Sequence, residues 1–413
     1  MTSFSLQNFG CRVNQAEAFE WAEAFQKGGL RFERDSARVD LIIVNTCTLT
    51  SRADRDVRKF LAKVRRENPG ARVIVTGCLV DRAKAELEGL PNTTLIDNAG
   101  KEGLASLVLE MAGTSPAADP VRFRARGLLK VQDGCDCHCT FCVIPSVRGK
   151  GRSVPPQDAV RRLAGLAAHG FREVVLTGIH LSSYGGDLEP RTSLLDLLKA
   201  AEGLAGALRL RLSSLDPRLL GPELREFLAA SPLIQPHFHL SLQHGSDAVL
   251  ARMGRRSRAA DYREVMADLR RLRPDAALGA DIITGFPGES EDDFAALRGL
   301  LVDSPLTYFH VFSYSPRPGT PAADWSPVDQ AAIRRRTGEL RAISAARSKA
   351  FRESQLGRVL EAIVIRKRAG QAELLTGNYI KVLAPADGLS SGDLVSVTID
   401  RIDERVAFGT ARG

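Results

Sequence analysis

The sequence predicts an α/β protein in three parts: an N-terminal parallel α/β domain, a partial β/α barrel and a small C-terminal β-barrel. Three observations support this prediction. Strand-like apolar runs alternate with helical patterns over the first hundred residues, and the same alternation resumes from residue 127. From residue 355 onward, the strand-like runs follow one another directly, separated by Gly, Asp and Ser.

Residues 1–112 form the predicted N-terminal domain. Strand-like runs at 41–46, 72–77 and 94–97 alternate with helices, which predicts a parallel sheet. The first of these helices is indicated by apolar residues at i, i+3, i+4 and i+7 spacing, namely Val57, Phe60, Leu61 and Val64. Residues 113–126 are small, basic and contain proline, so they are interpreted as a linker.

The partial barrel is predicted for residues 127–354 and the small β-barrel for residues 355–413. The strands expected in the larger of these two regions are 172–178, 207–214, 237–243, 277–285 and 309–314. Helical patterns separate them, and this spacing is typical of a β/α barrel or of part of one.

Charge and hydropathy narrow the class of protein. The net charge is +8, and basic residues concentrate in two helical stretches, 52–67 and 331–354. Each stretch alone could be a solvated helix face, but together they favour a nucleic-acid partner. No apolar run is long enough to cross a membrane, and the N-terminus lacks the features of a secretory signal. We therefore expect a cytoplasmic protein whose cysteines bind metal or take part in redox chemistry.

Four of the seven cysteines lie within residues 135–142. Cys135, Cys139 and Cys142 have x3 and x2 spacing, which differs from the paired C-x2-C arms of zinc sites. Three thiolates on one loop suit a 4Fe–4S cluster with one iron free of protein ligands. The alternative is a zinc site with Cys137 or His138 as its fourth ligand. Cys137 is expected to be a bystander, because its ligation would close the open iron.

The other three cysteines are far apart in the sequence but occupy similar positions. Cys47 and Cys78 directly follow predicted strands, and Cys11 follows the stretch LQNFG. Ligands of parallel α/β domains gather at the carboxyl ends of strands, so these thiols could form a second three-thiolate site. Three unrelated buried cysteines are the alternative, since free cysteine is a common core residue.

At this point the sequence resembles a known family. C-x3-C-x2-C at the start of a β/α barrel is similar to the radical SAM (S-adenosylmethionine) enzymes. The motifs that resemble the methylthiotransferases among them follow in order as FGCRVNQAE, VNTCTLTSRAD, VTGC, GCDCHCTFCVIPSVRG, LTGIHLSSYG, LSLQHGSDAVLARMGRR, DIITGFPGES and FSYSPRPGTPA. The resemblance covers nearly the whole chain and implies that the C-terminal barrel is a TRAM domain, which binds RNA.

The resemblance implies two 4Fe–4S clusters, with S-adenosylmethionine as radical source and methyl donor. Cys135, Cys139 and Cys142 match the ligands of the radical SAM cluster, and Cys11, Cys47 and Cys78 match those of the auxiliary cluster. The implied reaction replaces an unreactive C–H bond by C–S–CH3, which side chains alone cannot do. Cys137 departs from the family pattern, which usually has another residue there.

Further residues at strand ends are implied to contact S-adenosylmethionine. They are Thr177, Gly178, Ser213, Ser214, Gln243 and the backbone from Ile282 to Gly285. For each of them, a purely structural role as a polar or turn residue is the alternative. His180, His239 and His244 are assigned no catalytic role, because an isolated histidine in such a barrel is more often a satisfied core or rim residue.

The substrate implied by GCRVNQAE and NTCTLTSRAD is N6-threonylcarbamoyladenosine at position 37 of tRNA. Isopentenyladenosine at the same position is the first alternative, and an aspartate of a ribosomal protein is the second. The implied partners are the tRNA anticodon stem-loop and an electron donor such as flavodoxin or ferredoxin, while the sulfur source is unknown. In the TRAM region, the candidate phosphate contacts are Arg366, Lys367, Arg368 and Lys381. An iron–sulfur or zinc protein that binds RNA without catalysis is the alternative from another class.

Overall fold

A computed structural model describes residues 2–113 and 124–412 of the chain. Residues 114–123, which make up most of the predicted linker 113–126, lie outside the described residues. The chain divides into two compact units. Of the described residues, the N-terminal unit holds 2–113 together with the segments 133–151 and 315–323. The barrel unit consists of the remaining residues, and the two units are described separately.

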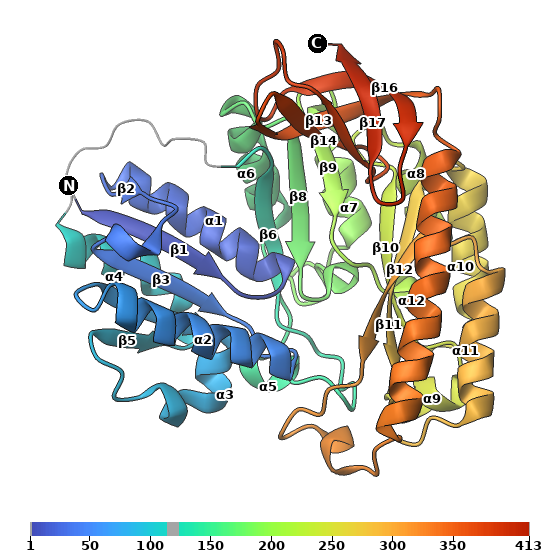
Figure 1. Ribbon diagram of the computed structural model, residues 1–413, viewed down its shortest axis with the longest axis horizontal. Coiled ribbons are helices and arrows are strands. Elements are labelled where there is room, and N and C mark those ends of the chain that lie inside the picture. Colours follow the sequence, from blue (N-terminus) through green and yellow to red (C-terminus); the bar gives the residue numbers. More distant parts are fainter. Residues whose placement is uncertain (1, 114–123, 413) are drawn as a thin grey trace. The chain divides into compact units, whose positions relative to one another are not determined.

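The N-terminal unit contains a parallel sheet in the order β2-β1-β3-β4-β5, flanked by helices (Figure 1). Its strands are β1 (Ser3–Asn8), β2 (Arg31–Phe32), β3 (Leu41–Thr46), β4 (Arg72–Gly77) and β5 (Thr93–Ile96). Its helices are α1 (Arg12–Lys27), η1 (Ser36–Arg38), α2 (Ser51–Glu67), α3 (Cys78–Leu87), η2 (Ala99–Gly103), α4 (Leu104–Ala112) and α5 (Ile144–Arg148). The predicted parallel α/β domain is confirmed.

Helix α2 shows why the sequence folds in this way. The Thr50 hydroxyl caps the helix by accepting from the amide of Ala53. Val57, Leu61 and Val64 are buried on one face against the sheet. The predicted strands β3 and β4 are confirmed to the residue, whereas β1 was not predicted as a strand.

The barrel unit holds two parallel sheets, β7-β6-β8-β9 and β10-β11-β12. Its strands are β6 (Gly127–Asp133, whose last residue belongs to the N-terminal unit), β7 (Arg152–Ser153), β8 (Glu173–Gly178), β9 (Arg209–Leu212), β10 (His237–Gln243), β11 (Ala277–Thr284) and β12 (Tyr308–Ser313). Isolated bridges join Leu210 to Ile234 and Leu215 to Leu240, which connects the two sheets into a curved, partial β/α barrel. The predicted partial barrel is confirmed.

Helices alternate with these strands. They are α6 (Pro156–Ala168), η3 (Leu181–Ser183), α7 (Leu194–Ala200), η4 (Glu202–Leu204), η5 (Pro217–Leu219), α8 (Pro222–Ala230), α9 (Asp247–Arg252), α10 (Ala259–Leu272), α11 (Glu291–Asp303) and α12 (Gln330–Glu353). The short helix η6 (Pro321–Asp324) belongs to the N-terminal unit except for its last residue. Strand β10 shows how its two faces differ. Phe238, Leu240 and Leu242 are fully buried, whereas His239 and Gln243 on the opposite face are partly exposed.

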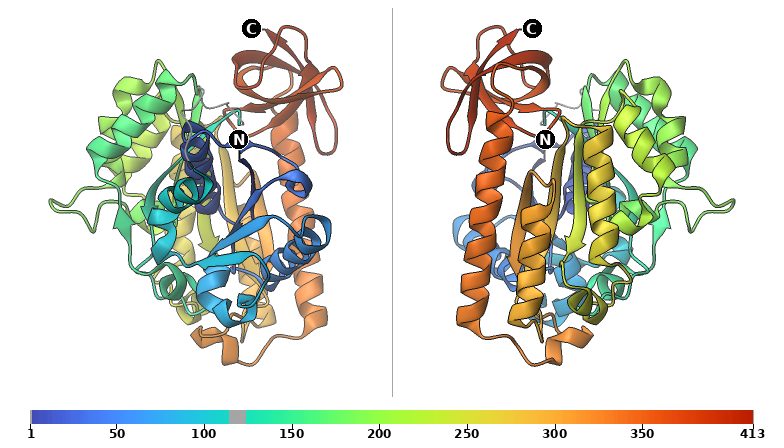
Figure 2. Two further views of the ribbon diagram at one scale, coloured as in Figure 1. Left: turned by 90° about the vertical axis from the view of Figure 1, so that its left-hand side faces the viewer. Right: turned by 90° about the vertical axis from the view of Figure 1, so that its right-hand side faces the viewer.

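The last strands close a β-barrel in the order β13-β14-β15-β17-β16. They are β13 (Val359–Arg368), β14 (Gln371–Thr376), β15 (Lys381–Pro385), β16 (Leu394–Ile402) and β17 (Ala407–Arg412). The long helix α12 lies along β12 and leads directly into this barrel (Figure 2). The predicted small C-terminal β-barrel is confirmed. Among the described residues, no helix combines the length and the apolar character needed to cross a membrane.

Candidate metal centres

Cys11, Cys47 and Cys78 lie at the carboxyl ends of three neighbouring strands in the N-terminal unit. Cys11 follows β1 and occupies the N-cap position of α1. Cys47 directly follows β3, and Cys78 is the first residue of α3 after β4. Strands β1, β3 and β4 are adjacent and parallel, so their ends meet at one edge of the sheet. The three thiols are close enough to influence one another electrostatically.

Two glycines let the backbone approach these thiols. Gly10 has a φ of +126°, and a Cβ there would collide with the Cβ of Cys47 and lie 2.9 Å from its Sγ. Gly77 has a φ of +100°, and a Cβ there would lie 2.8 Å from the amide nitrogen of Thr46. Both positions therefore require glycine for conformation as well as for space. The result is a close-fitting cradle around the cysteines.

The thiols of this site are shielded from water. Cys47 and Cys78 are only 3% and 2% exposed. Burial raises the pKa of the Cys47 thiol to about 12 and also raises the pKa of Cys11. The raised pKa values favour the protonated form of Cys11 and Cys47, and a metal must displace these protons on binding. None of the three forms a disulfide.

Arg148 connects this site to the loop that carries the other cysteines. Its Nε donates to Cys78 Sγ at 3.3 Å, and its Nη2 donates to Asn14 Oδ1 at 2.6 Å. Its Nη1 donates to Glu17 at 3.0 Å and to Asp133 at 2.8 Å. The side chain is only 1% exposed. Burial opposes the charge of this guanidinium, but Glu17 and the Cys78 sulfur favour it and raise the pKa of Arg148.

Other buried charges complete the surroundings. Lys101 donates to Glu17 at 2.7 Å and is itself 6% exposed. Arg317 donates to Thr48, the residue directly after Cys47, at 2.7 Å. It also donates to Asp54 at 2.6 Å. These contacts explain why the segment 315–323 belongs to the N-terminal unit. No role was predicted from the sequence for these charged residues, although Glu17, Asp54 and Arg317 lie within the quoted motifs.

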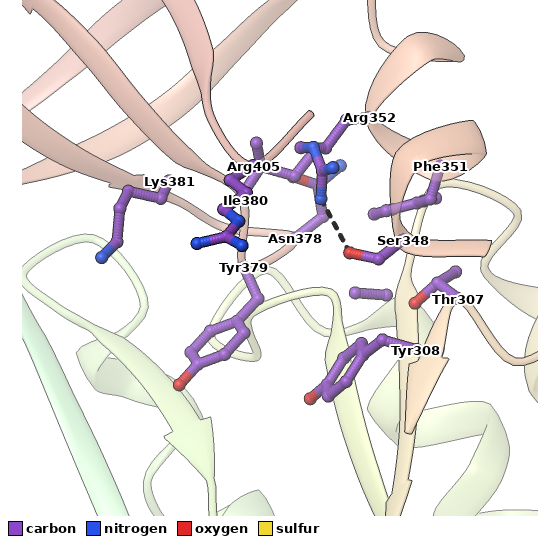
Figure 3. Close-up of a pocket in the computed structure, with 11 residues that line it drawn as sticks. Thr307, Tyr308, Ser348, Phe351, Arg352, Asn378, Tyr379, Ile380, Lys381 and Arg405 are labelled. Atoms are coloured by element: carbon purple, nitrogen blue, oxygen red, sulfur yellow. Dashed lines mark hydrogen bonds between the residues drawn. The ribbon is translucent and has the colours of Figure 1, made fainter. Parts of the chain in front are cut away.

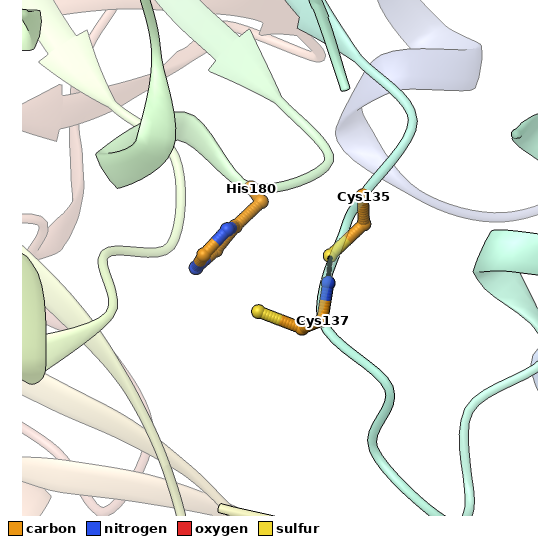
Figure 4. Close-up of side chains that lie close together, drawn as sticks. All are labelled: Cys135, Cys137 and His180. Carbon is orange, nitrogen blue, oxygen red and sulfur yellow. Dashed lines mark hydrogen bonds between the residues drawn. The ribbon is translucent and has the colours of Figure 1, made fainter. Parts of the chain in front are cut away.

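The second group of cysteines lies in the loop after β6. Figure 4 shows Cys135 and Cys137 next to each other on this loop, where the amide of Cys137 donates to Cys135 Sγ at 3.4 Å. The loop is also held by the Cys142 amide, which donates to the Cys139 carbonyl at 3.0 Å, and by the Cys135 amide, which donates to the Gly149 carbonyl at 3.1 Å. All four cysteines are partly exposed and outside disulfides.

The environment of this loop differs from that of the strand-end site. The hydrogen bond with the Cys137 thiol raises the pKa of Cys135, and burial raises the pKa of Cys142 to about 11. Gly134 has a φ of +68°, and a Cβ there would collide with the carbonyl oxygen of Lys150. The loop is therefore shaped by local backbone contacts.

The donor sets suit clusters better than single ions. Four ligands around one zinc ion, each about 2.3 Å from it, place their sulfurs within about 4.6 Å of one another. Among the described residues, neither set of three cysteines has its sulfurs all within 4.8 Å of one another. A 4Fe–4S cluster binds each thiolate through a different iron, so its ligands stand apart around it. Each set offers the three thiols that such a cluster would take.

The residues expected to contact S-adenosylmethionine lie at strand ends of the barrel unit. Thr177 and Gly178 end β8, and the Gly178 amide donates to Ser213 Oγ at 3.4 Å. The buried Thr177 hydroxyl has no hydrogen-bond partner among the described residues. Ser214 is exposed beside the buried Ser213.

The remaining expected contacts belong to β10 and β11. Gln243 pairs with Ile282 across the two strands and has a φ of +71°. The Ile282 side chain is fully buried, so only its backbone could meet a ligand. The Gly285 amide donates to Glu289 at 2.7 Å. The three histidines lie beside carboxylates: His180 Nε2 is 3.3 Å from Asp216, His239 Nε2 is 3.0 Å from Asp281 and His244 Nε2 is 3.5 Å from Glu289.

Comparison with known proteins is consistent with this geometry. Residues 129–301 match the Radical SAM superfamily, and residues 3–96 match Uncharacterized protein family UPF0004. The fold is similar to that of a radical S-adenosylmethionine methyltransferase, TsrM, from Kitasatospora setae, with a TM-score of 0.55, 16% identity, and coverage of 78% of this chain and 77% of that one.

Curated relatives extend the similarity over nearly the whole chain. A threonylcarbamoyladenosine tRNA methylthiotransferase MtaB from Rickettsia prowazekii is 34% identical, covering 91% of this chain and 89% of the relative. Its counterpart from Aquifex aeolicus is 35% identical, covering 92% and 95%. A tRNA-2-methylthio-N(6)-dimethylallyladenosine synthase from Desulfitobacterium hafniense is 31% identical, covering 98% and 96%. The chain belongs to the radical SAM methylthiotransferase family.

Proposed function

We propose that this protein converts N6-threonylcarbamoyladenosine at position 37 of tRNA into its 2-methylthio derivative, replacing C2–H by C2–S–CH3. The similarity to relatives named for this reaction carries the proposal, because it extends over about nine-tenths of the chain. The arrangement of the cysteines supports it. The reaction needs both a hydrogen abstraction and a sulfur insertion, and the N-terminal unit presents two separate sets of three thiols.

The six cysteines would hold two clusters. Cys135, Cys139 and Cys142 would bind the 4Fe–4S cluster that takes S-adenosylmethionine, and Cys11, Cys47 and Cys78 would bind the auxiliary cluster. When bound, these groups supply the one-electron chemistry and the sulfur that an unactivated C–H bond requires. Because each set supplies only three thiolates, each cluster would have one iron without a protein ligand.

The chain's own residues position and shield these groups. The Arg148 guanidinium stabilises negative charge on the Cys78 sulfur through a buried N–H···S contact. Gly10 and Gly77 allow the strand ends to close around the site. In the barrel unit, Thr177, Gly178, Ser213, Ser214, Gln243, Ile282 and Gly285 would bind and orient S-adenosylmethionine.

Contacts to tRNA phosphates are proposed for helix α2. Its seven Lys and Arg residues are exposed, and Arg52 has 84% of its side chain in contact with solvent. Helix α12 is different, because much of its positive charge is used within the protein. Arg336 is buried against Glu289, and Arg347 donates to the carbonyls of Ser304 and Leu306. We therefore assign to α12 a mainly structural role and to α2 the larger contribution to RNA affinity.

The remaining parts of the proposal concern partners and place. The anticodon stem-loop would be the bound part of the tRNA, and a one-electron donor such as flavodoxin or ferredoxin would reduce the clusters. A reducing cytoplasm suits this chemistry, because the cluster thiols must stay outside disulfides.

Nucleoside mass spectrometry tests the proposal directly. Bulk tRNA is compared from a host that lacks its own methylthiotransferases, with and without this gene. We expect a methylthio gain on threonylcarbamoyladenosine alone. The Cys135→Ala/Cys139→Ala/Cys142→Ala variant is the matched control and should show no gain.

Other outcomes would redirect the assignment. A gain on isopentenyladenosine would keep the reaction and change the substrate, as the similarity to the Desulfitobacterium relative allows. No gain on either nucleoside would contradict the proposal and lead to a test on the ribosomal protein. If reconstituted protein also fails to cleave S-adenosylmethionine, the chain is a non-catalytic RNA-binding protein.

A further inference from the structure

A pocket of about 140 Å³ lies within the barrel unit, between the start of β12, the end of α12 and the turn that joins β14 to β15. Figure 3 shows the rings of Tyr308 and Tyr379 at this pocket, together with Arg352, Lys381 and Arg405. Aromatic faces surrounded by basic side chains are a combination that binds unpaired nucleotides. No step of the proposed reaction uses these residues.

The ring of Tyr379 is held in place from below. It stacks on the buried His237 ring, with centroids 4.1 Å apart and an interplanar angle of 22°. The Arg211 guanidinium lies 5.1 Å from the Tyr379 centroid. Arg211 is itself buried against Glu173, and it donates to the carbonyls of Thr376 and Gly377 in the turn. The ring is thus held in place by a buried histidine and a buried cation.

The backbone at Tyr379 is strained. Its φ is +66°, a left-handed conformation that bulky residues rarely adopt. The Tyr379 amide donates to the Thr376 carbonyl, and the Thr376 amide donates to the Ile380 carbonyl, so the turn imposes this conformation. Strain of this kind persists where the surrounding structure holds a side chain for a purpose. Here it presents a partly exposed aromatic ring to the pocket.

Tyr308 supplies a second oriented ring. Its hydroxyl is hydrogen-bonded to His237 Nε2 at 2.7 Å and to His239 Nδ1 at 3.1 Å. A Cβ at position 279 would collide with this ring, so Gly279 makes the space in which it lies across β11. The ring planes of Tyr308 and Tyr379 differ by 21°, with centroids 6.4 Å apart. The two rings are therefore nearly parallel.

The aromatic surface continues along β12 toward the expected cofactor. Tyr308, His310 and Phe312 alternate on one face, with centroids 5.4 Å and 6.4 Å apart. Ser313 at the far end pairs with Thr284, next to Gly285. The five residue steps from Tyr308 to Ser313 span about 17 Å at about 3.3 Å per residue. The pocket is therefore too far from that end to hold the reacting base.

We propose that this pocket binds the base of an unpaired loop nucleotide flanking the reacting adenosine, by stacking on Tyr379 and Tyr308, with phosphate contacts from Lys381 and Arg405. Both cations are exposed at the pocket, which matches a polyanionic ligand, and Lys381 also pairs with Glu373 at 3.2 Å. The inference rests on the proposed tRNA activity and adds a subsite to it.

Binding of anticodon stem-loop RNA to the wild-type protein provides the first test. Each loop nucleotide is replaced in turn by an abasic one, and the dissociation constant is measured. Base–aromatic stacking predicts that one flanking position weakens binding about 10-fold when its base is removed. A scan in which no flanking position changes binding by more than about twofold would overturn the inference.

Variants at Tyr379 link that position to the pocket. Tyr379→Asn removes the ring and tolerates the positive φ, whereas Tyr379→Phe keeps the ring. We expect Tyr379→Asn to weaken binding about 10-fold and to lose nothing further with the abasic RNA, while Tyr379→Phe binds as the wild type. The matched control is Phe408→Leu, because Phe408 also stacks with an arginine on the same barrel, Arg401. Independent, multiplicative losses from Tyr379→Asn and from the abasic RNA would exclude direct stacking.

A fluorescent base separates this inference from the proposed reaction. 2-Aminopurine at the identified position should be quenched on binding to wild type and to Tyr379→Phe, and remain bright with Tyr379→Asn. Lys381→Gln and Arg405→Gln should each lower the salt dependence of binding by about one phosphate contact. Quenching without a methylthio product would support the base-binding pocket and contradict the proposed reaction. A methylthio product with no effect of Tyr379→Asn on binding or quenching would support the reaction and contradict the pocket.

Discussion

The two cysteine sites of the N-terminal unit are built in opposite ways. Cys11, Cys47 and Cys78 come from separate strands of one sheet, and a network of buried ions surrounds them. Cys135, Cys139 and Cys142 come from one irregular loop and are partly exposed. The first site depends on contacts between residues far apart in the chain, and the second depends on local backbone geometry. We expect their responses to substitution to differ accordingly.

Removing a whole set of ligands should have the largest effect. Anaerobically reconstituted wild type should hold about eight irons, and either triple Cys→Ala variant about four. Cys135→Ala/Cys139→Ala/Cys142→Ala should also abolish reductive cleavage of S-adenosylmethionine. Cys11→Ala/Cys47→Ala/Cys78→Ala should retain that cleavage and lose methylthio transfer. Iron analysis and chromatography of 5′-deoxyadenosine measure both. Retention of all eight irons would refute the ligand assignment.

Arg148→Met should destabilise the strand-end site strongly. It removes the buried guanidinium that pairs with both Glu17 and Asp133, and removing one partner of a buried ion pair typically costs about 3–5 kcal/mol in the free energy of unfolding. Urea denaturation of the apoprotein measures the change. Arg161→Met is the matched control, because Arg161 pairs with Asp158 at the surface and should contribute at most about 1 kcal/mol.

A double variant tests whether the stability lost in Arg148→Met comes from the charge of Arg148. Arg148→Met/Glu17→Gln removes a positive and a negative charge together, so it should be more stable than the sum of the two single variants predicts. Additive losses would mean that Arg148 acts through packing and not through charge.

Glycine substitutions should separate the two sites. Gly10→Ala brings a Cβ against Cys47 and should reduce the iron content to about four, with cleavage of S-adenosylmethionine intact. Gly134→Ala clashes with Lys150 in the loop and should impair cleavage instead. Gly89→Ala is the control, because Gly89 also has a positive φ but has open space around its Cβ position. The same iron loss in all three would indicate general destabilisation.

Cys137→Ala should have the smallest effect. Cys137 is hydrogen-bonded to Cys135 but is expected to be a bystander. We expect about eight irons and an unchanged electron paramagnetic resonance signal from the reduced loop cluster. A loss of about four irons would make Cys137 a ligand of the loop cluster.

The sequence predicted local features well. Strands β3, β4 and β10 match their predicted ranges. Each is a short apolar-rich run that ends at turn residues, a pattern contained within a few positions of the sequence. Strand β1 was missed, since SFSLQN is partly polar, unlike the apolar runs of β3 and β4. Its position beside β3 is a long-range pairing that a local pattern does not contain.

The sequence by itself determined the fold class, the cysteine spacing of the loop and the order of the family motifs. Only the tertiary structure placed Arg148 against Cys78 and stacked Tyr379 on His237. It also paired Arg336 of α12 with the buried Glu289. The physical reason is the range of the interactions. Propensity and periodicity act between near neighbours, whereas Arg148 and Glu17 are separated by 131 positions and meet only after the chain has folded.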